Sequence, residues 1–224
     1  MKRSKQSSRG KFITLEGVEG VGKSTHLKFL GRYLQERGIS VRITREPGGT
    51  PAADEIRQIL LTNHMEKVHP MSELLLMFAA RALHVENVIR PALKAGIWIV
   101  CDRFTDASYA YQGGGRGIAV RHIESLERMV LKGLQPDMTI LLDAKIDIGM
   151  ARVKRRGLLD RFEQEKDDFF KRVRRVYLAR ASRDPRRIKV VNASGSITDV
   201  QTQISELLDK HISRWQCIPN PKLH

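Results

Sequence analysis

The chain has 224 residues, 41% of them hydrophobic and 29% charged, and a formal net charge of +15 at pH 7. This composition is typical of a soluble globular protein with one substantial core. Its longest apolar runs, 74–80 and 97–101, are too short to span a bilayer, and no apolar stretch of signal-peptide length follows the basic start. The two cysteines, Cys101 and Cys217, support neither a disulfide framework nor a zinc site. We therefore expect a cytoplasmic protein without a membrane segment.

The strong positive charge has two interpretations. It could form a nucleic-acid surface, or it could serve small polyanions beside a solvated basic exterior. Lys and Arg are spread along the chain, with local clusters at 152–156, 171–175 and 183–189, and no aromatic residues alternate with them as a single-strand stacking platform requires. We favour small polyanions and expect no nucleic-acid partner.

Strand-like and helix-like patterns alternate along the chain. Short β-rich or apolar runs predict five strands, at 11–15, 39–44, 97–101, 138–142 and 188–191. Apolar residues at helical spacing predict helices from 23 to about 37, and at about 51–62, 70–94, 120–132, 147–155, 167–181 and 198–214. We expect the glycine-rich segment 111–117 to be a loop.

Alternating strands and helices predict an α/β fold: a parallel sheet of about five strands with helices on both faces. There is no internal repeat and no linker between domains. We therefore expect a single domain over 11–214, a flexible basic N-terminus over 1–10 and a loose tail over 215–224.

The sequence GVEGVGKST at 17–25 matches the G-x-x-x-x-G-K-[ST] phosphate loop, and it lies between a predicted strand and a predicted helix. Glycines in such a loop turn backbone N–H groups toward the phosphates, at the positive end of the helix dipole. Lys23 is expected to reach the β- and γ-phosphates and Ser24 to offer its hydroxyl to Mg²⁺. Asp102 follows a buried strand, where a metal-orienting carboxylate belongs in such a sheet.

The phosphate loop alone does not distinguish a switch, a motor and a kinase. A guanine-specific switch reads its base with Asn-Lys-x-Asp, but the nearest string here, 144–147, has Ala in place of Asn. A kinase that joins two phosphates needs many cations, and no base if the acceptor is an ionised phosphate oxygen. The chain supplies Arg45, Arg103, Arg116 and the segment 154–165, which we expect to be a small cationic lid, at about 154–166, closing over the phosphates.

Six separated blocks together resemble the thymidylate kinase (dTMP kinase) family. They are GVEGVGKST, TREPGGT (44–50), LLMFAAR (75–81), CDRF (101–104), AYQGGGRG (110–117) and LLDRFEQE (158–165). The resemblance extends from about Phe12 to the final helix. It implies the nucleoside-monophosphate-kinase fold, transfer of a phosphoryl group from MgATP to dTMP, and a homodimer. A kinase for another nucleoside monophosphate is the nearest alternative, and a nucleotide-dependent switch or nucleic-acid-binding ATPase is a more distant one.

The resemblance also implies roles for individual residues. The loop would bind ATP through Gly17, Val18, Glu19, Gly20, Val21, Gly22, Lys23, Ser24 and Thr25. Phe78 would stack on the thymine ring and Arg81, its i+3 neighbour, would bond the edge of the ring. The remaining dTMP contacts would come from Glu19, Arg45, Glu46, Arg103 (on the acceptor phosphate), Ser108, Tyr111 (against the sugar, favouring deoxyribose) and Gln112.

The source of the catalytic arginine follows from the loop. In one form of the family the loop carries an arginine, and in the other it carries a carboxylate while the lid supplies the arginine. Here Glu19 is present and the loop has no arginine, so the resemblance indicates the bacterial-type enzyme. Arg156 and Arg161 are then the catalytic candidates beside Lys23 and Arg103, and Arg155 is a weaker third. The family often has Tyr or His where this chain has Phe104, whose role stays open.

Overall fold

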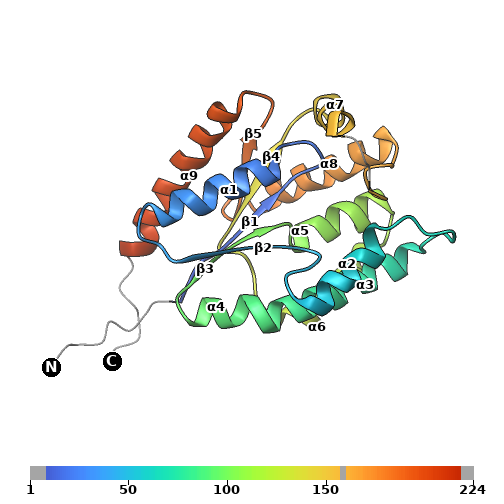
Figure 1. Ribbon diagram of the computed structural model, residues 1–224, viewed down its shortest axis with the longest axis horizontal. Helices are drawn as coiled ribbons and strands as arrows, with labels where there is room; N and C mark the ends of the chain where they lie inside the picture. The colour runs from blue at the N-terminus through green and yellow to red at the C-terminus, as the bar shows by residue number, and fades with distance from the viewer. Residues whose placement is uncertain (1–8, 157–159, 218–224) are drawn as a thin grey trace.

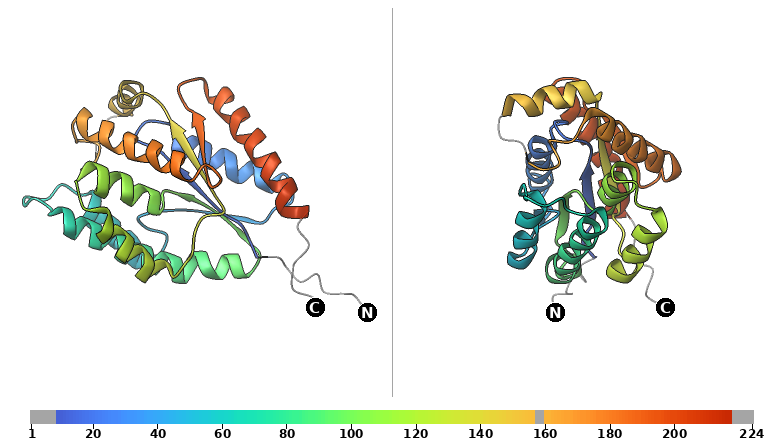
Figure 2. Two further views of the ribbon diagram at one scale, coloured as in Figure 1. Left: turned by 180° about the vertical axis from the view of Figure 1, so that it is seen from behind. Right: turned by 90° about the vertical axis from the view of Figure 1, so that its right-hand side faces the viewer.

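The computed structural model describes residues 9–156 and 160–217, without the side chains of 154–156 and 216–217. Its strands form one sheet: β1 (Phe12–Glu16), β2 (Val41–Arg45), β3 (Trp98–Asp102), β4 (Met138–Asp143) and β5 (Ile188–Asn192). Every neighbouring pair is parallel, in the order β2-β3-β1-β4-β5. Helices lie on both sides of this sheet (Figures 1 and 2), so the predicted five-stranded α/β fold is confirmed.

The seven predicted helices are present in the predicted order, with the helix over 70–94 divided into three stretches, and the structure adds α5 (Thr105–Ser108) and η2 (Tyr109–Gly115), which were not predicted. The helices are α1 (Lys23–Gln35), α2 (Pro51–Leu61), α3 (Pro70–His84), α4 (Arg90–Lys94), α5, α6 (Val120–Leu131), α7 (Ile146–Arg156), α8 (Asp167–Arg183) and α9 (Ile197–Cys217), with π-helical stretches η1 (Val85–Ile89) and η2. The last helix continues to Cys217, so the first residues of the predicted tail are helical.

Alternate side chains of the central strands enter different parts of the core, as the period of a strand requires. Ile13 and Val100 join the cluster that contains Leu30 and Leu34 of α1. Their strand neighbours Phe12, Ile99 and Cys101 join a second cluster with Val85 and Ile89 of η1 and with Leu93 of α4. The central strands are therefore buried on both faces, which explains their continuous apolar sequences.

The predicted helix over 70–94 is correct in extent but not uniform. Between α3 and α4 the backbone takes a π-helical turn, η1, immediately before Pro91. Proline has no N–H to donate and its ring disfavours an unbroken α-helical ladder, and a π-helical turn is one way to shift the ladder past such a residue.

The glycine-rich segment 111–117 was expected to be a loop, and this prediction is wrong over most of its length. Residues up to Gly115 belong to η2. A Cβ atom at Gly114 would lie 2.6 Å from Val176 Cγ2, and one at Gly115 would lie 2.4 Å from Phe169 Cε2. These glycines therefore allow η2 and α8 to pack closely, a requirement that the sequence pattern does not distinguish from a turn.

Because every strand is parallel, all carboxyl ends meet at one edge of the sheet. The register pairs Leu15 with Asp102 and Glu16 with Leu141, which brings the phosphate loop beside the end of β3. Among the described residues, no helix is long and apolar enough to cross a membrane.

Candidate active site

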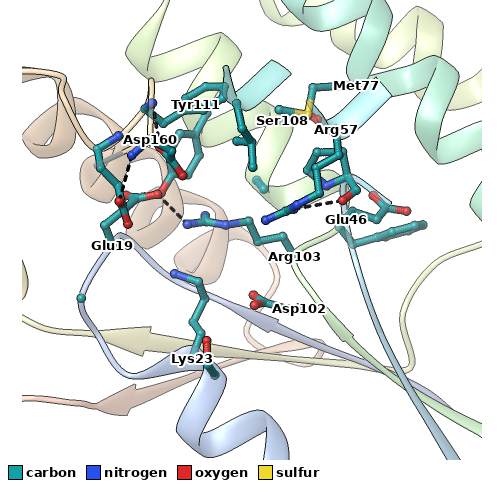
Figure 3. Close-up of a pocket in the computed structure, with 18 of the residues that line it drawn as sticks. Glu19, Lys23, Glu46, Arg57, Met77, Asp102, Arg103, Ser108, Tyr111 and Asp160 are labelled. Carbon is teal, nitrogen blue, oxygen red and sulfur yellow. Dashed lines mark hydrogen bonds and ion pairs between the residues drawn. The ribbon is translucent and has the colours of Figure 1, made fainter. Parts of the chain in front are cut away.

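A cavity of about 590 Å³ opens at this edge of the sheet (Figure 3). Its volume is in the range of small-molecule and cofactor sites. It brings together thirteen of the residues predicted from sequence: Glu19, Gly20, Gly22, Lys23, Ser24, Thr25, Glu46, Arg81, Asp102, Arg103, Ser108, Tyr111 and Gln112.

The phosphate loop is held in shape by backbone packing. Gly20 has a φ of +72°, and a Cβ atom there would lie 1.9 Å from the carbonyl oxygen of Gly149 in α7. Any side chain at Gly20 would therefore push the loop away from α7. Val18 and Val21 are buried beneath the loop, so they support its shape from the core side.

Lys23 begins α1 and lines the cavity. Its ammonium group donates to the carbonyl oxygens of Gly17, at 3.1 Å, and Val18, at 2.7 Å. Burial, and secondly the positive charge of Arg103, lower the pKa of Lys23 to about 8. The Lys23 ammonium is thus held next to the loop, and the negative charge of a bound phosphate would favour its charged form.

Ser24 and Asp102 are the residues predicted to hold Mg²⁺, and both line the cavity. The Oδ1 atom of Asp102 is buried and has no hydrogen-bond partner among the described residues. A buried carboxylate oxygen without a donor suits a hard cation. The described residues include no group of three or more His, Cys, Asp or Glu side chains that could hold a metal unaided. This donor set therefore fits an ion that takes its other ligands from phosphate and water.

Arg103 extends across the middle of the cavity (Figure 3). It has a φ of +65°, a left-handed conformation that costs a non-glycine residue energy. Its guanidinium donates to Glu19 Oε1 at 2.7 Å and to the Gly17 carbonyl at 3.1 Å, and it lies over the ring of Tyr111, 4.6 Å from the centroid. Tyr111 in turn donates to Glu19 Oε2 at 2.6 Å. Glu19 thus holds an arginine and a tyrosine in fixed positions.

Glu16, which sequence reasoning missed, supports this arrangement from the end of β1. It is fully buried at the end of β1 and accepts from the Phe104 amide and from the Tyr177 hydroxyl, both at 2.7 Å. Burial, and secondly the charge of Asp106, raise the pKa of Glu16 to about 8. The Phe104 bond fixes the backbone immediately after Arg103. The available sequence signal for Glu16 was an acidic residue at the end of an apolar strand, immediately before Gly17.

Arg81 of α3 also lines the cavity. It donates to Glu46 Oε2 at 2.7 Å, to Ser108 Oγ at 3.0 Å and to the Phe104 carbonyl at 3.0 Å. Its guanidinium also lies over the ring of Phe78, 4.5 Å from the centroid. Phe78 is only 2% exposed and does not line the cavity, so its predicted stacking on thymine stays a prediction.

Some predicted residues lie elsewhere. Arg45 is exposed and pairs with Asp54 at 3.1 Å. Arg161 does not line the main cavity: it donates to the Leu60 carbonyl at 2.9 Å and pairs with Glu73 at 2.8 Å. The side chains of the lid candidates 155 and 156 lie outside the described residues.

Other lining residues were not predicted as site residues. Arg57 of α2 donates to the Pro47 carbonyl at 3.0 Å, and burial, then the charge of Arg45, lower its pKa. Arg152 reaches the carbonyl oxygens of Gly20 and Ala193, both at 3.4 Å. The sequence does not show that a single arginine in a predicted helix lines a cavity, because its partners come from other elements.

The comparisons with known proteins agree with this geometry. The thymidylate kinase family model matches residues 15–204. The chain belongs to the thymidylate kinase family. It is 50% identical to the thymidylate kinase of Nitrosomonas europaea over 201 residues, covering 90% of this chain and 93% of that protein. It is 53% identical to the thymidylate kinase of Chromohalobacter salexigens over 208 residues, covering 92% and 98%.

A solved structure supports the same assignment. The crystal structure of thymidylate kinase from Ehrlichia chaffeensis matches with a TM-score of 0.74 and 32% sequence identity, over 90% of this chain and 99% of that one. The predicted membership of the thymidylate kinase family is thereby confirmed, and it holds over nearly the full length of each relative.

The lowered pKa of Lys23 predicts how ATP binding depends on pH. Below about pH 8 the ammonium is already charged, whereas above it the free site must take up a proton to bind a triphosphate. The Kd of a non-hydrolysable ATP analogue should therefore rise above pH 8, by up to about tenfold per pH unit. Isothermal titration between pH 7 and 9.5 measures this.

Lys23→Arg provides the control, since an arginine stays charged throughout this range. Its affinity should be weaker but less dependent on pH. If the Kd of the ATP analogue rose equally steeply with pH in both proteins, the titration would belong to another group, such as Glu16.

Proposed function

We propose that this chain transfers the γ-phosphoryl group of MgATP to dTMP, giving dTDP and ADP, in the supply of dTTP for DNA synthesis. Membership of the family carries the reaction. The observation that supports it in the structure is that Lys23 and Arg103 line the same cavity. That cavity is also lined by Arg81 and Gln112, which are predicted to contact the base. The lack of a membrane-spanning helix among the described residues agrees with a cytoplasmic enzyme.

The chemistry requires no base from the protein. An ionised oxygen of the dTMP phosphate attacks the γ-phosphorus, and the bond from that phosphorus to the β–γ bridging oxygen breaks, leaving ADP. Lys23 binds the β- and γ-phosphates, and Arg103 binds the acceptor phosphate. Ser24 and Asp102 would hold Mg²⁺, which would neutralise charge on the triphosphate. The protein thus contributes position and positive charge.

The pair of Tyr111 and Glu19 favours a deoxyribose. The Tyr111 hydroxyl is committed to Glu19 and its ring is covered by Arg103, so the tyrosine presents a fixed surface to the sugar. A 2′-hydroxyl directed at this surface would lack a partner, which costs binding energy. Glu46 supports the acceptor side by holding Arg81. Arg45, from the same block, is exposed and paired with Asp54, so the structure adds no support for its predicted contact with dTMP.

The lid is proposed to supply the remaining positive charge. The loop has no arginine, so Arg156 is the first candidate to contact the transferred group, and Arg161 the second. The pairing of Arg161 with Glu73 favours Arg156, because the buried carboxylate already holds the Arg161 guanidinium outside the main cavity.

The chain is also proposed to form a homodimer. Leu75 on α3 and Val120 and Met129 on α6 are more than half exposed. Exposed apolar side chains on neighbouring helices suit contact with a second copy. Sedimentation equilibrium measures the mass, and a monomer at micromolar concentration would contradict this part of the proposal.

Release of ADP from MgATP tests the reaction itself. It should depend on the acceptor and be fastest with dTMP among dTMP, UMP, CMP, AMP and GMP. A coupled assay for ADP measures all of these on one enzyme preparation. A rate that is independent of every acceptor would indicate a hydrolase or switch, and a faster rate with another monophosphate would reassign the substrate.

The lid assignment predicts a selective kinetic effect. Arg156→Ala should lower kcat by about 10²- to 10³-fold and leave the Kd of ATP within about threefold, because the lid acts on charge that develops in the transition state. Steady-state kinetics and direct binding separate the two effects. Near-normal turnover of Arg156→Ala, with a large loss in Arg161→Ala, would transfer the role to Arg161.

A further inference from the structure

Glu73 is a fully buried carboxylate that the reaction above does not use. It lies in the first turn of α3, the helix that also carries Arg81. Arg116 donates to it at 3.2 Å, Arg161 pairs with it at 2.8 Å, and Gln112 donates its side-chain amide N–H to it at 2.9 Å. It therefore joins two arginines to a residue that lines the cavity.

The two arginines decide which way the amide of Gln112 lies. A carboxylate that is paired with two guanidinium groups is ionised, and an ionised carboxylate only accepts hydrogen bonds. The NH₂ group of Gln112, and not its oxygen, must then face Glu73. The amide oxygen is left with no hydrogen bond among the described residues. Gln112 is 1% exposed, and its backbone carbonyl accepts from the Ile118 amide at 2.9 Å, so the residue is held in place.

The cavity consequently presents a defined hydrogen-bonding pattern. Each terminal nitrogen of Arg81 makes one hydrogen bond and retains a second N–H, so this side chain can still donate. Gln112 can accept. A thymine ring has an acceptor at O4 next to a donor at N3, which matches this pair. A cytosine ring has a donor at N4 next to an acceptor at N3, which conflicts with both residues.

We propose that Glu73 is a positioning residue for base specificity: by fixing the amide of Gln112 it makes the cavity offer an acceptor to N3 of the base, and so selects thymine over 5-methylcytosine. This inference rests on the proposed function, since it takes dTMP as the acceptor. Glu73 itself acts only through Gln112.

The test compares dTMP with 5-methyl-dCMP, which keeps the methyl group and differs at positions 3 and 4 of the ring. Glu73→Gln keeps the shape of the side chain but can accept or donate, so the amide of Gln112 is free to turn over. The ratio of kcat/KM for dTMP to that for 5-methyl-dCMP should fall at least about tenfold relative to the wild type.

Two variants separate this effect from loss of the arginine pairs. Glu165→Gln removes another carboxylate partner of Arg116 and leaves the bond between Glu73 and Gln112, so its substrate ratio should stay within about twofold of the wild type. In a Gln112→Ala background, Glu73→Gln should change the ratio by less than about twofold, because its target is gone.

If Glu73→Gln does not fold, as a thermal melt would show, Glu73→Asp keeps the charge for the arginines while withdrawing it from Gln112, and it should also lower the ratio. The role of Glu73 would be overturned, and the proposed function left standing, by either of two results. One is an unchanged ratio of kcat/KM for dTMP to that for 5-methyl-dCMP in a folded Glu73 variant. The other is an equal fall of this ratio when Glu73→Gln is made in the Gln112→Ala background. A wild-type chain that transfers no phosphate to dTMP would overturn the proposed function, and this role with it.

Discussion

Arg103 is a partly buried guanidinium immediately after β3, and the architecture of the site follows from satisfying its charge. A buried cation without partners is strongly unfavourable, so the residues around it must supply acceptors. They come from separate elements: Glu19 and the Gly17 carbonyl from the phosphate loop, and the Tyr177 hydroxyl, 3.4 Å away, from α8. Tyr111 of η2 covers the guanidinium. The same contacts that stabilise Arg103 therefore fix the loop, η2 and α8 relative to one another.

The parallel sheet makes this convergence possible. It places the ends of β1 and β3 side by side, so Glu16 can accept from the amide that follows Arg103 although the two residues are far apart in sequence. The left-handed backbone at Arg103 is thus supported by a hydrogen bond on its carboxyl side and by ion pairing of its side chain. Glu73 has a corresponding place near Gln112, to which it joins Arg116 and Arg161.

Sequence reasoning succeeded where the signal is local. Continuous apolar runs predicted the buried strands, and the spacing of Gly17, Gly22 and Lys23 predicted the phosphate loop. It failed where a residue acts through partners from distant elements. Glu16, Glu73 and Arg57 are single charged residues in otherwise regular patterns, and only the fold shows what they contact. The glycines of 111–117 show the same limit, since close packing on α8 and a turn have the same composition.

The central claim is that Arg103 joins the phosphate loop to the acceptor by holding the phosphate of dTMP, and paired binding measurements test it directly. Arg103→Asn respects the left-handed backbone, which asparagine tolerates, and combining it with Glu19→Gln avoids leaving a buried carboxylate unpaired. Relative to Glu19→Gln alone, the double variant should bind dTMP at least about a hundredfold more weakly, whereas thymidine, which has no phosphate, should bind within about threefold. Equal losses for dTMP and thymidine would contradict the account, because Arg103 would then shape the cavity without binding the phosphate.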